Sequence, residues 1–266
     1  MLPELEIVKT KSGIFCLFKN NDLIGQSLRQ NGSFAEKEAN LAIRFARNQP
    51  GSLVLDIGAN LGAFAIPVAK SLLEMGEEIY LHCFEPQRIV CLQLSTNVFI
   101  NRLSNVVIHN AAVGHENSDI SIPVLDFERS RNPGGFSIDP RIRDNLAQSA
   151  AEGITATNTY LANGFESVKQ VTLDSISFER PIAFIKLDVE GHELECLKGA
   201  TKTLRNSRFP PIVFEDWGSK FDWYREKSSQ LRAYLTNDLG YVLESIGGRE
   251  LLARSEEHTS ELQSQR

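Results

Sequence analysis

The stretch SLVLDIGANLGAFA, residues 52–65, decides the fold class of this chain. Apolar residues lead to an acid, Asp56, which is followed by a turn of small residues from Gly58 to Gly62 and then by a helix-like pattern. Such a turn lets backbone N–H groups and a helix N-terminus approach a ligand closely, as in nucleotide-binding α/β domains. We therefore expect an α/β fold with a doubly wound, mostly parallel sheet and helices on both faces.

An acid ends the next strand-like stretch. Residues 79–84 are mostly apolar and lead directly into Glu85-Pro86. A carboxylate at this place in a nucleotide-binding domain can accept both hydroxyls of a ribose. Together with the turn at Gly58, Glu85 indicates a ligand that contains adenosine.

The spacing of the glycines in the turn distinguishes between two ligands that contain adenosine. A dinucleotide fingerprint reads G-x-G-x-x-G, because a pyrophosphate needs the second glycine for close backbone approach. Here the pattern is Gly58-x-Asn60-x-Gly62, which places a polar side chain at that position. Asp56 would repel a phosphate but suits the ammonium group of S-adenosylmethionine. The residues favour S-adenosylmethionine over NAD, and a structural turn that binds no ligand is the alternative.

Composition narrows the class of protein. The chain has 266 residues, 42% of them hydrophobic, which is enough for one large α/β core. A net charge of -6 argues against nucleic acid as the main partner. No apolar run approaches the roughly 20 residues of a membrane span, and the first residues lack the pattern of a secretory signal. The four cysteines form no C-x-x-C pair, so we expect reduced thiols, no membrane span and a cytoplasmic location.

Strand-like and helix-like patterns alternate along most of the chain. Residues 5–18 predict a short hairpin. The expected core strands are 52–57, 79–84, 105–110, 182–187, 212–214 and 241–246, and the expected helices cover 34–48, 61–74, 227–238 and the stretches after Pro86 and Gly191. Between residues 115 and 170 the alternation stops, and the polar composition predicts a long irregular insertion, which in a compact domain is usually functional or disordered.

Polar residues follow the expected strands at their carboxyl ends. They are Asp56, Glu85, Asn110, Asp188, Glu190 and Glu215. The carboxyl ends of parallel strands meet at one edge of an open α/β sheet, where such sheets bind their ligands. We therefore expect these side chains to lie around one ligand site.

Seven motifs suggest a particular family. They are VLDIGANLGAF at 54–64, FEP at 84–86, AAVG at 111–114, GGFS at 134–137, TLDSI at 172–176, IKLDVEGHELECLKGA at 185–200 and FED at 214–216. With them the chain resembles the FkbM-type S-adenosylmethionine-dependent methyltransferases over residues 30–246. The resemblance implies the class I methyltransferase fold, which is Rossmann-like, and methyl transfer to oxygen on a hydroxylated small molecule, often a saccharide or a natural product. The corresponding division is an N-terminal hairpin or extension over 1–33 and a methyltransferase domain over 34–253, with an insertion over 115–170.

The resemblance also assigns roles in cofactor binding. Asp56, Gly58, Asn60 and Gly62 would surround the methionine end of S-adenosylmethionine. Glu85 would bind the ribose hydroxyls, and Asn110 and Ala111 would border the adenine. Glu36 or Glu38, ahead of the first core strand, would touch the cofactor or the substrate.

The block after the fourth core strand carries the candidate catalytic residues. Methyl transfer to an alcohol needs alignment and a group that takes the hydroxyl proton. Asp188 and Glu190 suit base or orienting roles, and Lys186 lies two residues earlier on the same strand face, where a structural salt bridge is its alternative. His192 is either a base near neutral pH or a solvated residue of the first helical turn. We interpret Glu193 as a helix N-terminal charge.

Two further groups of charged residues allow other readings. Asp188, Glu190 and Glu215 have the oxygen ligands that magnesium prefers, but zinc-type spacings are missing and we expect no metal. The arginines of the insertion either recognise an acidic or phosphorylated acceptor or form a solvated surface; they are Arg129, Arg131, Arg141 and Arg143.

The last residues have a different character. Residues 254–264, RSEEHTSELQS, resemble the translation of a sequencing-library adapter and show no apolar periodicity. We therefore interpret 254–266 as a tail outside the fold. The resemblance implies a sheet that closes with a hairpin, and we expect too few residues before the tail for its second strand.

Three functions remain open. An O-methyltransferase is favoured, because the acids after the fourth and fifth core strands are not needed for cofactor binding alone. A non-catalytic S-adenosylmethionine-binding or scaffold protein is the alternative from another class. An NAD-dependent oxidoreductase is disfavoured by Asn60 and the missing third-glycine spacing.

Overall fold

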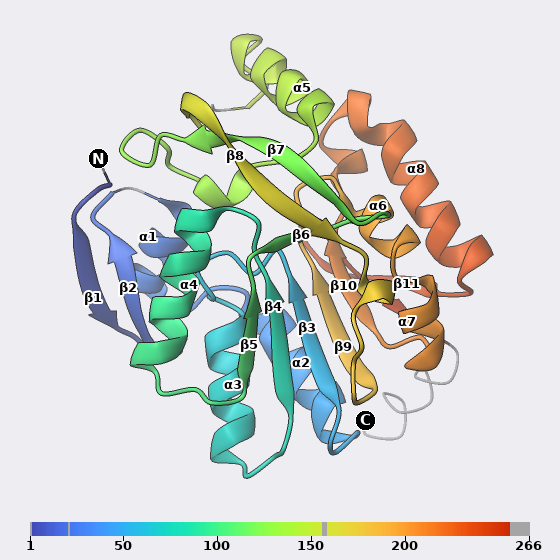
Figure 1. Ribbon diagram of the computed structural model, residues 1–266. Helices are drawn as coiled ribbons and strands as arrows, with labels where there is room; N and C mark the ends of the chain where they lie inside the picture. Colours follow the sequence, from blue (N-terminus) through green and yellow to red (C-terminus); the bar gives the residue numbers. More distant parts are fainter. Residues whose placement is uncertain (1, 21, 156–158, 256–266) are drawn as a thin grey trace.

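A seven-stranded sheet forms the centre of the molecule. The computed structural model describes residues 2–20, 22–155 and 159–255 (Figure 1). The strand order is β11-β12-β10-β9-β3-β4-β5. The strands are β3 (Leu53–Ile57), β4 (Tyr80–Phe84), β5 (Val106–His109), β9 (Ile182–Leu187), β10 (Ile212–Glu215), β11 (Val242–Gly247) and β12 (Glu250–Arg254). All neighbours from β5 to β10 pair in parallel, and β12 pairs antiparallel with β10 and β11.

Helices cover both faces of this sheet. On one face lie α2 (Glu36–Arg47), α3 (Ala65–Glu74) and α4 (Arg88–Ile100), and on the other α6 (Glu193–Lys198), α7 (Thr201–Asn206) and α8 (Arg225–Ala233). The side chains of β3 alternate between them, since Val54 packs in the first core and Leu55 and Ile57 in the second. The predicted α/β fold with a mostly parallel, doubly wound sheet is confirmed. Among the described residues, no helix is long and apolar enough to span a membrane.

The helices differ from the expected ones in three places. Helix α3 begins at Ala65 and not at residue 61, because Gly62 keeps the preceding turn in a left-handed conformation (φ 93°). The expected helix after β9 is divided into α6 and α7 at Gly199, whose Cβ position would lie 2.0 Å from the Gly114 carbonyl oxygen. An additional helix, α1 (Leu23–Asn31), follows the N-terminal hairpin.

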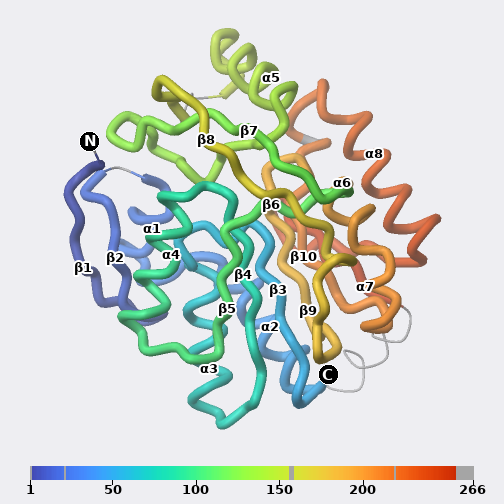
Figure 2. Tube along the Cα trace, viewed as in Figure 1, coloured from blue at the N-terminus to red at the C-terminus, as the bar shows by residue number. Residues whose placement is uncertain are grey.

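The insertion is a folded layer, so the expectation of an irregular segment is wrong. A second sheet has the order β6-β8-β7, with β6 (Ala111–Val113), β7 (Ser118–Leu125) and β8 (Leu161–Val171), and helix α5 (Pro140–Ala151) lies beside it. Ile122 of β7 and Val168 of β8 pack with Val90 of α4 and Phe136. Figures 1 and 2 show this layer above the carboxyl ends of the central strands.

The N-terminal residues form the expected hairpin. Strands β1 (Leu5–Lys9) and β2 (Ile14–Phe18) pair antiparallel. Figure 2 shows the hairpin beside α4, where Asn97 of α4 accepts the backbone N–H of Cys16 at 2.6 Å and Asn101 accepts that of Ile14 at 2.9 Å.

The expectation that too few residues remain for the last strand is wrong. Strand β12 lies between β10 and β11, and Leu251, Leu252 and Ala253 are buried. Gly247 and Gly248 both have positive φ, so a short connection reverses the chain. The strand includes Arg254, which we assigned to the tail. Residues 256–266 lie outside the described residues.

Candidate active site

A cavity of about 530 Å³ lies at the carboxyl edge of the central sheet. It collects residues from the ends of β3, β4, β9 and β10, from the start of α2 and from the insertion. Of the residues proposed from the sequence, it brings together Glu36, Glu38, Gly58, Asn60, Glu85, Ala111, Lys186, Asp188, Glu190 and Glu215. Asp56, Gly62, Asn110 and His192 are not among its lining residues.

The turn after β3 passes very close to the end of β9. A Cβ atom on Gly58 would lie 1.8 Å from the carbonyl oxygen of Asp188, and the φ of Gly58 is 84°, so only glycine fits there. Asn60 also has a left-handed backbone (φ 51°), and its side-chain oxygen accepts the N–H of Leu61 at 2.7 Å. The turn therefore presents backbone and the Asn60 side chain to the cavity beside Asp188.

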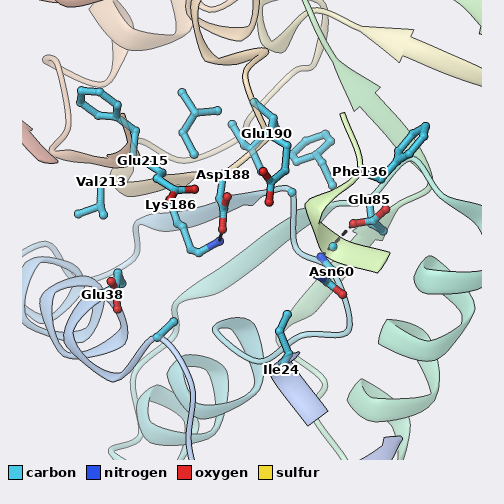
Figure 3. A pocket seen from close by; sticks show the side chains of 18 of the residues that line it. Ile24, Glu38, Asn60, Glu85, Phe136, Lys186, Asp188, Glu190, Val213 and Glu215 are labelled. Carbon is cyan, nitrogen blue, oxygen red and sulfur yellow. Dashed lines mark hydrogen bonds and ion pairs between the residues drawn. The ribbon is translucent and has the colours of Figure 1, made fainter. Parts of the chain in front are cut away.

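Glu85 lies across the cavity from Asp188 (Figure 3), and its side chain is buried, with 4% of the residue exposed. Its carboxylate accepts the backbone N–H of Asn60 at 3.0 Å and that of Gln87 at 2.9 Å. Burial raises its pKa to about 7, although these two hydrogen bonds act to lower it. A carboxylate has about four acceptor positions, so hydroxyl donors can still bind this one.

Lys186 lies between two acids, Asp188 in the cavity wall and the buried Asp56. Its Nζ lies 3.0 Å from Asp188 Oδ2 and 3.7 Å from Asp56 Oδ1. Asp56 is fully buried, and burial raises its pKa to about 6 despite the charge of Lys186. Burial opposes the charge of Lys186, yet Asp188 and Asp56 raise its pKa above the ordinary value. Asp56, which we expected to suit the ammonium group of S-adenosylmethionine, thus has the Lys186 ammonium beside it.

A buried acid holds the loop after β9. Glu190 (φ 53°) and Gly191 (φ 94°) both have left-handed backbones. Glu193, 2% exposed, accepts the N–H groups of Gly191 at 3.1 Å and Val189 at 3.4 Å, and accepts the hydroxyl of Tyr224 at 3.3 Å. Burial raises the pKa of Glu193 to about 7. Our interpretation of this residue as a helix-end charge missed its contact with Tyr224.

Three carboxylates gather on one side of the cavity. Oxygen atoms of Asp188, Glu190 and Glu215 lie within 4.8 Å of one another, and Figure 3 shows them opposite Glu85. Lys186 pairs with Asp188 and Arg249 pairs with Glu215 at 2.5 Å, so two of the three are already neutralised. Burial, and then the neighbouring carboxylates, raise the pKa of Glu190 well above its ordinary value. Within the described ranges, Glu190 has no hydrogen-bond or ion-pair partner.

Two residues proposed to touch the cofactor, Gly62 and Asn110, make structural contacts outside the cavity lining. A Cβ atom on Gly62 would lie 2.8 Å from a Leu94 methyl group, so this glycine lets α4 pack on the turn. The Asn110 amide donates to the carbonyl oxygens of Glu85 at 2.8 Å and Pro86 at 3.0 Å, which fixes the chain after β4.

His192 is not among the residues that line the cavity. Both of its ring nitrogens are buried without a hydrogen-bond partner among the described residues. Burial lowers its pKa to about 4, so the ring is neutral at physiological pH. Glu36 reaches the cavity wall but is largely exposed and pairs with Lys11 at 2.9 Å.

The insertion supplies site residues that the sequence reading did not propose. Asn132, Gly134 and Phe136 line the cavity, and a Cβ atom on Gly134 would lie 1.9 Å from the Asn60 amide nitrogen. The Gln87 amide donates to the carbonyl oxygen of Pro133 at 3.0 Å and holds this turn in place. The sequence signal that could have indicated this turn as part of the site is the glycine pair, Gly134-Gly135, of the GGFS motif.

The strand order and a cavity at the carboxyl edge define a class I methyltransferase fold. The family model described as "Methyltransferase FkbM domain" matches residues 56–243, and the chain belongs to this family. The resemblance inferred from the motifs is confirmed.

Several solved structures are similar to the chain. Methyltransferase FkbM from Methylobacillus flagellatus KT is 19% identical, with 76% of this chain and 43% of that chain covered and a TM-score of 0.47. Trm5b from Pyrococcus abyssi is 15% identical, with 94% and 54% covered and a TM-score of 0.44. Precorrin-6y C5,15-methyltransferase from Geobacter metallireducens is 13% identical, with 83% and 88% covered and a TM-score of 0.44. The chain thus spans about half the length of the first two. No curated protein matches the sequence.

Proposed function

We propose that this chain transfers a methyl group from S-adenosylmethionine to a hydroxyl of a small molecule, such as a saccharide or a natural product. Family membership supports methyl transfer. The observation that carries the finer proposal is the unpaired Glu190 carboxylate in the same cavity as Glu85 and the Gly58 turn. One wall therefore suits the cofactor and the other suits an acceptor whose proton must be removed.

The cofactor half is built from the ends of β3 and β4. Glu85 would accept the ribose hydroxyls, and Ala111 would border the adenine. Gly58 and Asn60, which also line the cavity, would face the methionine end. Asp56 is buried below the cavity, so we assign it an indirect role, in which it fixes Lys186 and through Lys186 the position of Asp188.

The acceptor half is built from the end of β9. S-adenosylmethionine would supply the methyl group, and its sulfur would keep the electron pair of the broken bond. Glu190 takes the proton of the acceptor hydroxyl as the new oxygen–carbon bond forms. A raised pKa makes Glu190 a stronger base than an ordinary carboxylate once it is deprotonated. Asp188, held by Lys186 at 3.0 Å, orients the hydroxyl.

The test measures transfer of labelled methyl groups to a panel of hydroxylated acceptors. Glu190→Gln and Asp188→Asn should each lower turnover by about 10² or more, while affinity for S-adenosylhomocysteine stays nearly unchanged. Glu116→Gln, an exposed substitution away from the cavity, is the matched control. Binding of S-adenosylhomocysteine without transfer to any acceptor would instead support the non-catalytic binding protein.

A further inference from the structure

A second cavity adjoins the first. Its volume is about 300 Å³. Five residues line both cavities: Asn132, Phe136, Glu190, Glu215 and Arg249. The carboxylates of Glu190 and Glu215 therefore lie where the two spaces meet. A molecule in the second cavity can bring a hydroxyl to Glu190 without entering the cofactor half.

The part of the second cavity that is not shared carries two cations. Arg143 of α5 donates through Nη1 to the carbonyl oxygens of Ser137 at 2.8 Å and Ile138 at 2.9 Å. Lys220 Nζ lies 4.7 Å from the centre of the Phe221 ring. Neither forms an ion pair within the described residues, whereas Arg249 at the junction pairs with Glu215. Asp139, close to Arg143 in sequence, is paired with Lys227 at 3.0 Å.

Three aromatic side chains belong to the wall of the second cavity. They are Phe136, Trp217 and Phe221. The rings of Trp217 and Phe221 pack edge to face, with their centres 5.9 Å apart. Apolar ring faces beside a few polar groups are typical of small-molecule sites. This wall suits the apolar face of a sugar ring.

We propose that the second cavity binds the acceptor and that this acceptor is a sugar carrying a phosphate or a carboxylate. This inference rests on the proposed methyl transfer and names its substrate class. The anionic group binds Arg143 and Lys220, since a guanidinium matches the oxygens of both anions. The sugar ring lies against Phe136 and Trp217. Its free hydroxyl then points to the shared end, where Glu190 takes the proton.

The structure also separates the four arginines of the insertion. Only Arg143 lines the cavity. Arg129 lies over the Tyr160 ring, with its guanidinium carbon 4.5 Å from the ring centre. Arg141 is exposed on the same helix as Arg143 and outside the cavity. Arg141→Gln is therefore a matched control for Arg143→Gln, because both remove one positive charge from α5.

Tryptophan fluorescence provides a test that does not depend on turnover. The chain has 2 tryptophans. Trp217 lines the cavity, and Trp223 packs in the same aromatic cluster. We titrate the protein with glucose 6-phosphate, glucuronate and glucose. Either anion, or both, should change the fluorescence saturably at concentrations about 10-fold or more below those needed for glucose. The comparison of the two anions identifies the anionic group.

Variants complete the experiment. Arg143→Gln and Lys220→Gln should each weaken binding of the anion about 10-fold or more, and Arg141→Gln should bind as the wild type does. Lys220 is exposed, so its variant tests the proposal even if Arg143→Gln folds poorly. Equal binding of glucose and the anions, no response to either anion, or wild-type affinity in Lys220→Gln would overturn the proposal. Calorimetry with S-adenosylhomocysteine, run in parallel, tests the methyltransferase proposal separately.

Discussion

Glu190 and Asn60 show how single residues shape this site. Both have left-handed backbones, at φ 53° and 51°, a conformation that costs side-chain-bearing residues about 1–2 kcal/mol. Each is held by a buried acid nearby, since Glu85 accepts the N–H of Asn60 and Glu193 accepts the N–H groups on either side of Glu190. Hydrogen bonds to Asn60 and to the two neighbours of Glu190 therefore help to offset this strain.

The raised pKa of Glu190 predicts a pH profile. The group must lose its proton before it can act as a base, so turnover should rise with pH through its pKa. Burial and the neighbouring carboxylates place that pKa well above the ordinary 4.5, and the rising limb should lie correspondingly higher. The measurement is kcat against pH with saturating substrates. A rising limb near pH 4.5 in the wild type, or a higher limb that is unchanged in Glu190→Gln, would contradict the assignment of the base.

Motif spacing predicted the acids at the strand ends, because strand, turn and acid are adjacent in sequence. It could not separate Asp188 from Glu190. That distinction depends on Lys186, which pairs with Asp188, and on burial among carboxylates from β9 and β10. The burial of His192 likewise depends on distant parts of the chain, so local sequence gave no sign of it.

At the scale of elements, the loop between β9 and α6 depends on a distant segment. Tyr224 belongs to the short helix η4 (Asp222–Tyr224) and donates its hydroxyl to Glu193. Gly191 is packed tightly below it, since a Cβ atom there would lie 2.9 Å from Ile142 of α5. The insertion and the C-terminal half of the chain thus both position the loop that carries Glu190.

We expect Glu193→Ala to lower kcat about 10-fold or more, because two backbone N–H groups lose a buried acceptor. Affinity for S-adenosylhomocysteine should change little. Glu193→Gln should keep most of the turnover, since its amide oxygen can still accept from Gly191. These variants are compared by kcat, KM and cofactor affinity. Wild-type kcat in Glu193→Ala, or equal losses in the Ala and Gln variants, would refute this positioning role.

At the scale of the whole molecule, the central sheet and the second sheet both contribute residues to the wall of the main cavity. The central sheet places the acids at one edge, and the insertion with its second sheet covers that edge (Figure 1). Hydrophobic patterning predicted the parallel strands, because each is a short run of mostly apolar residues that is continuous in the sequence. It did not predict the insertion, whose strand β8 pairs with β6 and β7 and whose core includes Phe18 and Val90 from elsewhere. It also missed β12 (Glu250–Arg254), because we assigned the residues from 254 onward to a tail outside the fold.

Strand β12 should contribute strongly to stability. Leu252 is 2% exposed and packs in the core between the sheet and helices α2 and α3. Leu252→Ala should lower the free energy of unfolding by about 2–5 kcal/mol. Val242→Ala on the neighbouring strand, where the side chain is 51% exposed, should change it little. Denaturant unfolding measures both, and equal effects would show that β12 is not part of the core.

The central claim is that the main cavity binds S-adenosylmethionine through Glu85, and calorimetric titration with S-adenosylhomocysteine tests it most directly. The wild-type protein should bind this product and should not bind NAD. Glu85→Ala should weaken the affinity about 10- to 100-fold, as expected for lost hydrogen bonds to a charged group. The protein should stay folded, with a lower melting temperature because the N–H groups of Asn60 and Gln87 lose their acceptor. Binding of NAD without any response to S-adenosylhomocysteine, or wild-type affinity in Glu85→Ala, would contradict the claim.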